Sequence, residues 1–475
     1  MALPESRIQE LLHRIAVKKV VSFFEREDIS RVCPGIKQTI TRHGVKKQKR
    51  ILTDSVKNLH RKFLSEGGQV SYSNFCKLRP FWTVQPKESD RETCLCHMHE
   101  NLHNMTHALR SKGLLAIDDV NDLVPLFMCS VDSIECAYSE CSKCSNTVFR
   151  FSRSVTEAEI NFPQWETRKK TYEQNGQVKE ATVTAKVMKT VKENEAVAMF
   201  LSAMKAFKKH WFTMRKQFAA FRENKNRIRD DECVIHVDFS ENFNCKYHSE
   251  IQAVHFGASH SQASLHTVVL YIKSQQPLCL CTISADLQHG PVGIWAHLKP
   301  VLEYIRTEFP QVKNLTFWSD GPSSQYKQKK NFLLLSTVPF AMGFQSNGWN
   351  YLESSHGKGA VDGVGATVKR LANDAICQGA DIDTPRKLFE TVSPLLTSVN
   401  LMYIEDQNFK YNEDNTSQDV PIIQGTRSIH QVNCIDEWVI VHRRLSCFCE
   451  WESGIVSACV TILRHSLMTF STKCL

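Results

Sequence analysis

Two aspartates each follow an apolar, β-branched or aromatic run, as expected at the end of a buried strand. Asp238 follows Val-Ile-His-Val, and Asp320 follows Leu-Thr-Phe-Trp-Ser eighty-two residues later. Such runs favour strands, and a carboxylate at the end of a buried strand costs free energy unless it is paired or binds a metal ion. Two such strands predict adjacent aspartates that hold divalent metal, the chemistry that cuts or joins phosphodiester bonds.

Further acids that could join this pair follow the two strands in the sequence. Apolar residues at helical spacing predict a helix over 360–377 with one buried stripe, and Asp362 lies on a different face. Glu353, at the end of the preceding strand, is the competing third acid, and a site with neither of them stays open. Lys369 follows Asp362 by two helical turns, which would place a cation next to a scissile phosphate.

Several polar residues around these acids are candidates for contact with DNA. They are Gln325, Lys327, His356, Lys358, Lys369 and Arg370. Surface exposure alone would also explain Gln325 and Lys327, and a lone histidine such as His356 is more often a hydrogen-bonded structural residue. The glycines at 357, 359, 363 and 365 would either let a phosphate backbone approach closely or allow tight packing of the helix on the sheet.

Residues 91–150 are rich in cysteine and histidine, in patterns that indicate zinc. Cys141-x2-Cys144 is a usual half-site, and Cys94 and Cys96, with His97 or His99, would supply the other half. The predicted ligands are Cys94, Cys96, His99, Cys136, Cys141 and Cys144. The ligands outnumber one site, so a second site stays open, as does the alternative of buried or incidental thiols. The zinc would have a structural role, because no nearby residue is an obvious general base that could act beside an open coordination position of the metal.

The composition describes a globular chain with an uneven positive charge. It has 475 residues with a net charge of +9, and 42% of the residues are hydrophobic, which predicts two or three domains. Basic residues cluster in 1–70 and again in 205–229, as expected for a nucleic-acid partner or for a solvated helix face. No segment has the roughly 18–20 apolar residues of a membrane span. The cysteines are then expected to be thiols or metal ligands rather than disulfides.

The order of apolar and polar segments predicts five regions. They are a basic helical region at 1–90 that could bind DNA, a zinc-binding segment at 91–150, a helical charged connector at 151–232, a catalytic domain at 233–400, and an acidic loop with a cysteine-containing tail at 401–475. Strand-like runs from 233 to 284 precede an alternation of helices and strands. This is the ribonuclease-H-like order with one strand too many, which makes 251–257 the candidate insertion.

Three strings resemble the catalytic domain of DDE/DDD-type transposases and integrases of eukaryotic DNA transposons and of genes derived from them. They are Val-Asp238-Phe-Ser-Glu-Asn, Trp-Ser-Asp320-Gly-Pro-Ser-Ser-Gln-Tyr-Lys and Ser-His356-Gly-Lys-Gly-Ala-Val-Asp362-Gly. The resemblance covers about residues 230–380. It implies an α/β, ribonuclease-H-like mixed sheet flanked by helices, with Asp238 and Asp320 as the first two acids around Mg²⁺ or Mn²⁺. The family more often has glutamate as the third acid, so Asp362 and Glu353 both remain candidates.

The same resemblance sets the functional expectations. It implies a nuclear, transposase-like protein that cleaves and transfers DNA strands, with double-stranded DNA as its partner, assembly as a homo-oligomer and no membrane association. A domesticated or catalytically inactive descendant of such a transposase would contain the same motifs. The alternatives are a non-catalytic DNA-binding or chromatin protein on the same scaffold, and a ribonuclease-H-like nuclease.

Overall fold

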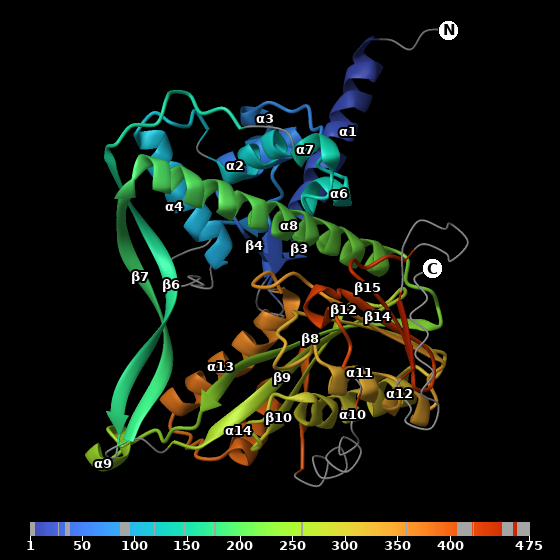
Figure 1. The fold of residues 1–475 in the computed structure, drawn as a ribbon. Helices are drawn as coiled ribbons and strands as arrows, with labels where there is room; N and C mark the ends of the chain where they lie inside the picture. Colours follow the sequence, from blue (N-terminus) through green and yellow to red (C-terminus); the bar gives the residue numbers. More distant parts are fainter. Residues whose placement is uncertain are drawn as a thin grey trace. The chain divides into compact units, whose positions relative to one another are not determined.

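The computed structural model divides the chain into two compact units. Unit 1 comprises Met1–Arg91 and Gln217–Leu475, and unit 2 comprises Glu92–Lys216 (Figure 1). The residues described are 5–26, 28–33, 39–85, 96–117, 119–145, 149–174, 177–257, 260–357, 359–405, 420, 422–448 and 459–462. Unit 2 is therefore an insertion within unit 1. Among the described helices, none has the length and apolar composition needed to cross a membrane.

A nine-stranded mixed sheet forms the centre of unit 1, in the order β13-β10-β9-β8-β11-β12-β14-β15-β16. Its strands are β8 (Glu232–Asn244), β9 (Gln262–Ile272), β10 (Leu278–Ser284), β11 (Asn314–Ser319), β12 (Ser346–Tyr351), β13 (Val399–Tyr403), β14 (Gln431–Asp436), β15 (Val439–Arg443) and β16 (Cys459–Ile462). The first three in the chain, β8, β9 and β10, pair antiparallel. β11 is parallel to β8, and β12 is parallel to β11. The acidic tail predicted at 401–475 therefore contributes three described strands, β14, β15 and β16, and the end of β13.

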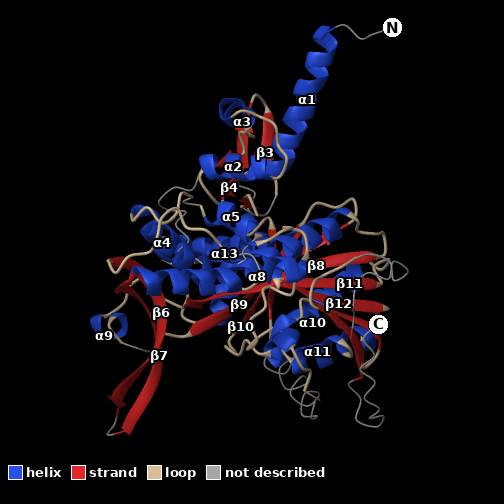
Figure 2. Cartoon of the chain, turned by 45° about the horizontal axis from the view of Figure 1, so that its top comes forward, coloured by secondary structure: helices blue, strands red, loops and turns tan. Residues whose placement is uncertain are grey.

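Helices cover both faces of this sheet (Figures 1 and 2). They are α10 (Pro291–Glu308), α11 (Lys329–Leu335), α12 (Val338–Ala341), α13 (Ala360–Cys377) and α14 (Pro385–Val392). The sheet has a hydrophobic core on each face, and successive residues of β9 point into different cores. Val268 packs in the cluster that contains Trp295 of α10, and Val269 packs in the cluster that contains Val361 of α13. A strand that is buried on both faces has a nearly continuous apolar sequence, which is why these runs were recognisable.

The predicted order of strands and helices from 233 to 377 is confirmed, with 251–257 as the exception. That segment contains a short helix, α9 (Gln252–His255), between β8 and β9, and lies outside the sheet. Ile251 is 71% exposed and Phe256 is 78% exposed. The run is therefore an insertion between β8 and β9, as expected for the one strand too many, and is not a strand of the sheet.

The N-terminal part of unit 1 mixes helices and strands. It contains α1 (Glu5–Phe24), β1 (Ser30–Val32), β2 (Thr39–Arg42), β3 (Val45–Gln48), β4 (Arg50–Leu52), α2 (Val56–Ser65), α3 (Tyr72–Leu78) and β5 (Thr83–Val84). Phenylalanines 23, 24, 63 and 75 form its core. The basic stretch forms a hairpin whose turn, His43-Gly44, has positive φ at both residues, the geometry of a two-residue turn. The basic helical region expected at 1–90 therefore has its helices, but its described residues also form five strands that were not predicted.

Unit 2 contains short helices, a long ribbon and most of one long helix. Its elements are α4 (His97–Ser111), α5 (Val120–Leu123), α6 (Ile134–Ala137), α7 (Ser142–Ser145), β6 (Glu159–Gln174), β7 (Gln177–Lys192) and the start of α8 (Glu193–Asn226). The connector predicted to be helical over 151–232 is helical only from Glu193. β7 alternates valine and threonine with other residues, and an Asn-Gly pair separates it from β6, which is the usual signal of a hairpin.

Candidate functional site

The parallel pairing of β8 and β11 places Asp238 and Asp320 side by side. Trp318 lies opposite His236 in the last pair in the register of the two strands, and Asp320 and Asp238 each follow that pair by two residues. Neighbouring strands lie about 4.8 Å apart. Burial raises the pKa of the Tyr326 phenol, and the charges of Asp238 and Asp320 raise it further. Both carboxylates are therefore within electrostatic reach of one hydroxyl group.

The N-terminus of α13 brings the third predicted acid to the same place. Burial and the charge of Asp362 raise the pKa of Asp320 to about 6, while Lys327 acts in the opposite direction. Asp362 also accepts a hydrogen bond from the backbone N–H of Gly359, at 2.7 Å, and so caps its own helix. Asp238, Asp320 and Asp362, far apart in the sequence, form one acidic cluster, which we call the acidic site.

One oxygen of the acidic site is buried without a hydrogen-bond partner. Within the described residues, Asp320 Oδ1 has none. Gly357 adds to this enclosure, because a Cβ built on it would lie 2.4 Å from Asp320 Cβ. A buried carboxylate oxygen is costly to leave unpaired. Carboxylate oxygens are preferred ligands of hard divalent cations, but among the described residues the three aspartates are not one of the groups whose ligand atoms all lie within 4.8 Å of one another.

Glu353, the competing third acid, pairs with a histidine and also acts on a buried lysine near Asp320. Its carboxylate is 2.9 Å from His430 Nε2. Lys327 is only 4% exposed, and burial lowers its pKa to about 8 although Glu353 and Asp320 both raise it. Lys327 is thus a buried counter-charge shared by Glu353 and Asp320, rather than the surface residue that its sequence position indicated.

The other residues predicted to contact DNA have more varied environments. Lys369 Nζ lies 3.9 Å from Glu241, and burial lowers its pKa. Arg370 pairs with Asp374 on the surface of α13, at 3.2 Å. Gln325 and His356 are half-buried in the loops after β11 and β12, and Lys358 lies outside the described residues. Of the described residues predicted to contact DNA, Lys327 is the one whose charge acts to lower the pKa of Asp320.

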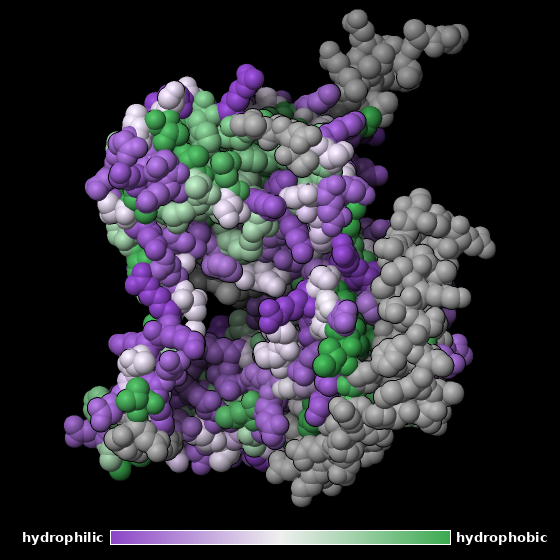
Figure 3. Space-filling view, in the orientation of Figure 1, coloured by the Kyte–Doolittle hydropathy of each residue, from purple (hydrophilic) through white to green (hydrophobic). Residues whose placement is uncertain are grey.

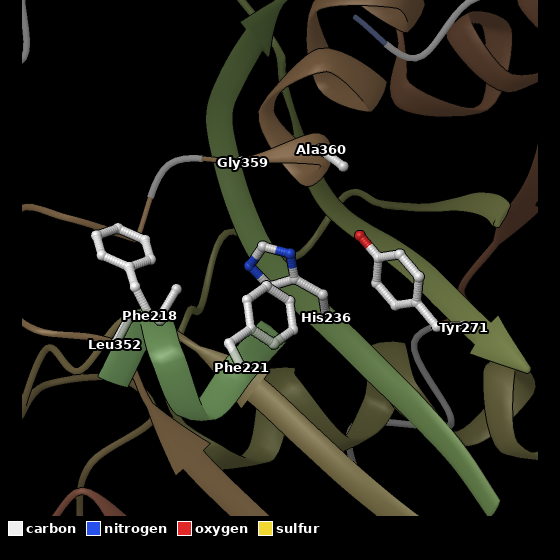
Figure 4. A pocket seen from close by; sticks show the side chains of 7 residues that line it. All are labelled: Phe218, Phe221, His236, Tyr271, Leu352, Gly359 and Ala360. Atoms are coloured by element: carbon white, nitrogen blue, oxygen red, sulfur yellow. The ribbon is translucent and has the colours of Figure 1, made fainter. Parts of the chain in front are cut away.

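A small pocket beside the acidic site contains a histidine that the sequence analysis did not select. It is lined by Phe218, Phe221, His236, Tyr271, Leu352, Gly359 and Ala360 (Figure 4). His236 precedes Asp238 by two residues and so shares its face of β8. Burial lowers the pKa of its imidazole to about 3, which keeps the ring neutral. Within the described part of the chain, neither ring nitrogen has a hydrogen-bond partner.

Close packing of α13 on the sheet accounts for two of the glycines. A Cβ at Gly359 would lie 3.0 Å from His236, and one at Gly365 would lie 2.5 Å from the hydroxyl of Ser240. Each of these distances is shorter than ordinary van der Waals contact. Of the two interpretations open for these residues, helix–sheet packing is the one that the contacts support.

Four cysteines of unit 2 form a compact group that could hold a metal ion. The thiols of Cys129, Cys136, Cys141 and Cys144 all lie within 4.8 Å of one another. Cys129 Sγ is 3.3 Å from Cys136 Sγ and 3.7 Å from Cys141 Sγ. Sulfurs bound to one tetrahedral zinc at about 2.3 Å would be roughly 3.8 Å apart, so the group has about the size of such a site. We call it the four-cysteine cluster.

Local backbone structure holds these thiols. The backbone N–H of Cys129 donates to Cys144 Sγ at 3.2 Å. The Ser133 hydroxyl is the main cause that lowers the pKa of Cys136 to about 6, and backbone N–H groups lower that of Cys141. Neighbouring thiols raise the pKa of Cys129 to about 12, which leaves it holding the proton. Hydrogen-bond donors that lower the pKa of a thiol favour its thiolate form, and the thiolate is the form of cysteine that binds a metal ion.

The predicted zinc ligands divide between two places. Cys136, Cys141 and Cys144 belong to the four-cysteine cluster, and its fourth member, Cys129, was not among the predicted ligands although it precedes Cys136 by only seven residues. Cys96 and His99 belong to a separate group with His210, so they do not complete the Cys141–Cys144 half-site. Cys94 lies outside the described residues. Cys447 is disulfide-bonded, which corrects the expectation of thiols at that position.

Two family models match parts of the chain. Residues 217–446 match a domain of unknown function (DUF8701), and residues 12–87 match a second domain of unknown function (DUF8699). No curated protein and no solved structure matches the chain. The first match begins at the residue where unit 1 resumes, and the second falls within its N-terminal part. The two similarities therefore follow the structural boundary and lie in unit 1.

Proposed function

We propose that the acidic site is a two-metal centre for DNA strand cleavage and transfer, and that the protein is a transposase-like nuclear protein or a domesticated descendant of one. One observation carries the proposal: the ends of two neighbouring parallel strands and the start of α13 bring Asp238, Asp320 and Asp362 together around a buried, unpaired carboxylate oxygen. Clustered carboxylates of this kind repel one another unless a cation or a proton neutralises them.

The order of the strands supports a ribonuclease-H-like reading of this sheet. In chain order β8, β9, β10, β11 and β12 are first to fifth, and their spatial order is third, second, first, fourth, fifth. The first three are antiparallel, and the fourth and fifth run parallel to the first. This is the order that the resemblance to DDE/DDD-type enzymes implies, with the first two acids at the ends of the first and fourth strands.

The residues that would hold Mg²⁺ or Mn²⁺ are Asp238, Asp320 and Asp362. Bound metal would activate a water molecule or a 3′-hydroxyl and stabilise the leaving oxygen. The protein's own contribution is positional: the strand register aligns two carboxylates, and the cap at Gly359 fixes the third. Lys327 limits the negative charge of the site when no metal is bound, because its ammonium group is buried against Asp320.

Double-stranded DNA is the proposed partner, and the β6–β7 ribbon offers it a basic surface. Each strand has sixteen residues, and hydrophilic side chains cover most of the visible ribbon (Figure 3). Lys170 and Tyr172 lie on one face near the turn, with Lys179 opposite Tyr172. A two-stranded ribbon fits the major groove of DNA. Handling two DNA ends would require a homo-oligomer.

Zinc is the metal that we propose for the four-cysteine cluster, in a structural role. A zinc ion bound by four thiolates has a net negative charge, which nearby cations and N–H donors stabilise. Lys208 is buried next to the cluster and donates to the carbonyl of Cys136 at 3.2 Å. Together with the N–H of Cys129, this lysine supplies the expected surroundings.

The decisive experiment measures nicking of plasmid and labelled duplex by the full-length protein in Mg²⁺, in Mn²⁺ and in EDTA. We expect metal-dependent nicking that falls below detection in Asp238→Asn and in Asp320→Asn. Asp374→Asn is the matched control, because Asp374 is an exposed acid paired with Arg370 on α13. Nicking that is indifferent to both site variants would refute the metal centre.

A non-catalytic DNA-binding or chromatin protein is the second candidate, and one observation favours it. Asp362 already has a structural task, because it caps α13 through Gly359, so an acid at that position would persist in a chain that had lost its chemistry. Retarded migration of DNA in gels, without any cleavage by the unmodified protein in either metal, would support this candidate. Cleavage of RNA–DNA hybrids but not of duplex DNA would instead indicate a ribonuclease-H-like nuclease.

A further inference from the structure

We propose that Cys96, His99 and His210 form a second zinc site in unit 2, distinct from the four-cysteine cluster. Cys96 immediately precedes α4, His99 lies in its first turn, and His210 lies on α8. The site would therefore join two helices that are more than a hundred residues apart in the sequence. The proposal uses only residues of unit 2 and does not depend on the function proposed for the acidic site.

The distances fit coordination of one ion. The ligand atoms of the three residues lie within 4.8 Å of one another. Cys96 Sγ is 3.4 Å from His210 Nε2. A sulfur at about 2.3 Å and a nitrogen at about 2.0–2.1 Å from a tetrahedral zinc would be roughly 3.5 Å apart. The rings of His99 and His210 have centroids 5.2 Å apart and are steeply inclined, at 69°, so they do not stack.

The helix start provides a separate argument. Cys96 occupies the N-cap position of α4, and its side chain makes no capping hydrogen bond. Serine, threonine, aspartate and asparagine are the residues that normally stabilise this position. The thiol is directed instead to His210, and both residues are buried, at 7% and 4% exposed. A cysteine that leaves the helix uncapped and meets a buried histidine is suited to bind metal.

Zinc suits the donor set better than other common ions. One thiolate and two imidazoles are borderline-soft ligands, whereas Mg²⁺ and Ca²⁺ prefer oxygen. Three protein ligands leave one position of a tetrahedron for water or a further donor. The competing explanation is a buried Cys–His hydrogen bond without metal, and the two differ in a countable quantity, the number of zinc ions per chain.

The test is zinc content by mass spectrometry of the full-length protein, purified without chelator and dialysed. We expect two zinc ions per chain, one in Cys96→Ser and in His210→Asn, and one in Cys141→Ser, which removes a ligand of the four-cysteine cluster. His107→Asn is the matched control, because His107 is an exposed histidine of α4, and it should retain two. One zinc ion in the unmodified protein, or two in His210→Asn, would overturn the proposal.

A spectroscopic titration keeps the test decisive should a variant fold poorly. Cobalt bound by four thiolates and cobalt bound by one thiolate with imidazoles have different absorption spectra, because sulfur-to-metal charge transfer scales with the number of sulfurs. Adding Co²⁺ to the metal-free unmodified protein should give two successive spectra of these two kinds. A single spectrum of the four-thiolate kind, complete at one equivalent, would contradict a second site.

Discussion

Gly357 lies against Asp320 with no room for a side chain. A Cβ at residue 357 would come within 2.4 Å of Asp320 Cβ and 3.2 Å of its Cα. These contacts involve the backbone and the first side-chain atom of the aspartate, which cannot rotate away. The position of one carboxylate of the acidic site is therefore set partly by the absence of a single methyl group.

Gly357→Ala should displace Asp320 and weaken metal binding. Overpacking of this kind costs about 1–3 kcal/mol, and the displacement would disturb the alignment with Asp238. The measurement is the rise in melting temperature on adding Mn²⁺, which we expect to be smaller than in the unmodified protein. Gly290→Ala is the control, because a Cβ there meets nothing within 4 Å. An unchanged Mn²⁺ effect in Gly357→Ala would show that this contact does not position the carboxylate.

Gly365→Ala should destabilise unit 1, although alanine is normally preferred over glycine in a helix by about 1 kcal/mol. The new Cβ would lie 2.5 Å from the Ser240 hydroxyl and 2.9 Å from Ser240 Cβ. Urea unfolding of Gly365→Ala, Ser240→Gly and the double variant forms a mutant cycle. We expect Ser240→Gly to remove most of the penalty of Gly365→Ala. Strictly additive effects would mean that the clash relaxes elsewhere.

Asp28→Asn should unfold more readily than the unmodified protein. The carboxylate is 10% exposed and forms ion pairs with Arg26, Lys62 and, from α8, Arg222. Removing one member of a buried ionic group leaves the others uncompensated, at a cost of about 3 kcal/mol or more. The measurement is the free energy of unfolding in urea at pH 7. Asp374→Asn, which breaks an exposed pair, should change this free energy by less than about 1 kcal/mol.

The contribution of Asp28 should also depend on pH in a defined direction. Burial alone would raise its pKa, but Lys62, Arg26 and Arg222 outweigh burial and hold the pKa far below its usual range. A depressed carboxyl pKa gives stability that is complete above the unfolded value of about 3.9 and is lost as the pH falls below it. The stability difference between the unmodified protein and Asp28→Asn should therefore be constant from pH 7 to about 5 and shrink towards pH 3. A constant difference down to pH 3 would contradict the ion pairing.

Removal of zinc should destabilise unit 2. A structural metal contributes directly to folding free energy, and each kcal/mol lost lowers the melting temperature of a domain of this size by roughly 4 °C. Incubation with a strong chelator and the substitution Cys136→Ser should both lower the melting temperature of this unit. Cys377→Ser, at an exposed cysteine of α13, should leave the transition unchanged. Identical melting curves with and without chelator would argue against a structural metal.

The strands of the sheet were predictable because the apolar residues that the fold buries are visible in their own sequences. The runs that end at Asp238 and Asp320 are mostly apolar, β-branched or aromatic, and residues of the strands they form pack in the buried clusters of the sheet. The helix over 360–377 was visible in the spacing of its buried residues, and its bounds, Ala360–Cys377, agree with the prediction. Local patterns of this kind are sufficient when burial is extensive.

Other features depend on contacts that no local pattern contains. His210 lies 114 residues from Cys96 and became a candidate ligand only through the packing of α8. Lys327 follows Gln325 in a polar stretch, yet the fold buries it beside Asp320. The β6–β7 ribbon was missed for a different reason. Its valines and threonines indicate strands, but its frequent charged residues favoured a helical interpretation.

The insertion of unit 2 has a consequence for synthesis on the ribosome. Arg222, at the end of α8, and β8 leave the ribosome only after the 125 residues from Glu92 to Lys216 have been made. At about 5–20 residues per second, that interval is roughly 6–25 s. During this time the ion pair between Asp28 and Arg222 cannot form, although Arg26 and Lys62 have already been made. Chaperone dependence of this chain is therefore expected to be set by the speed of translation between residues 92 and 216.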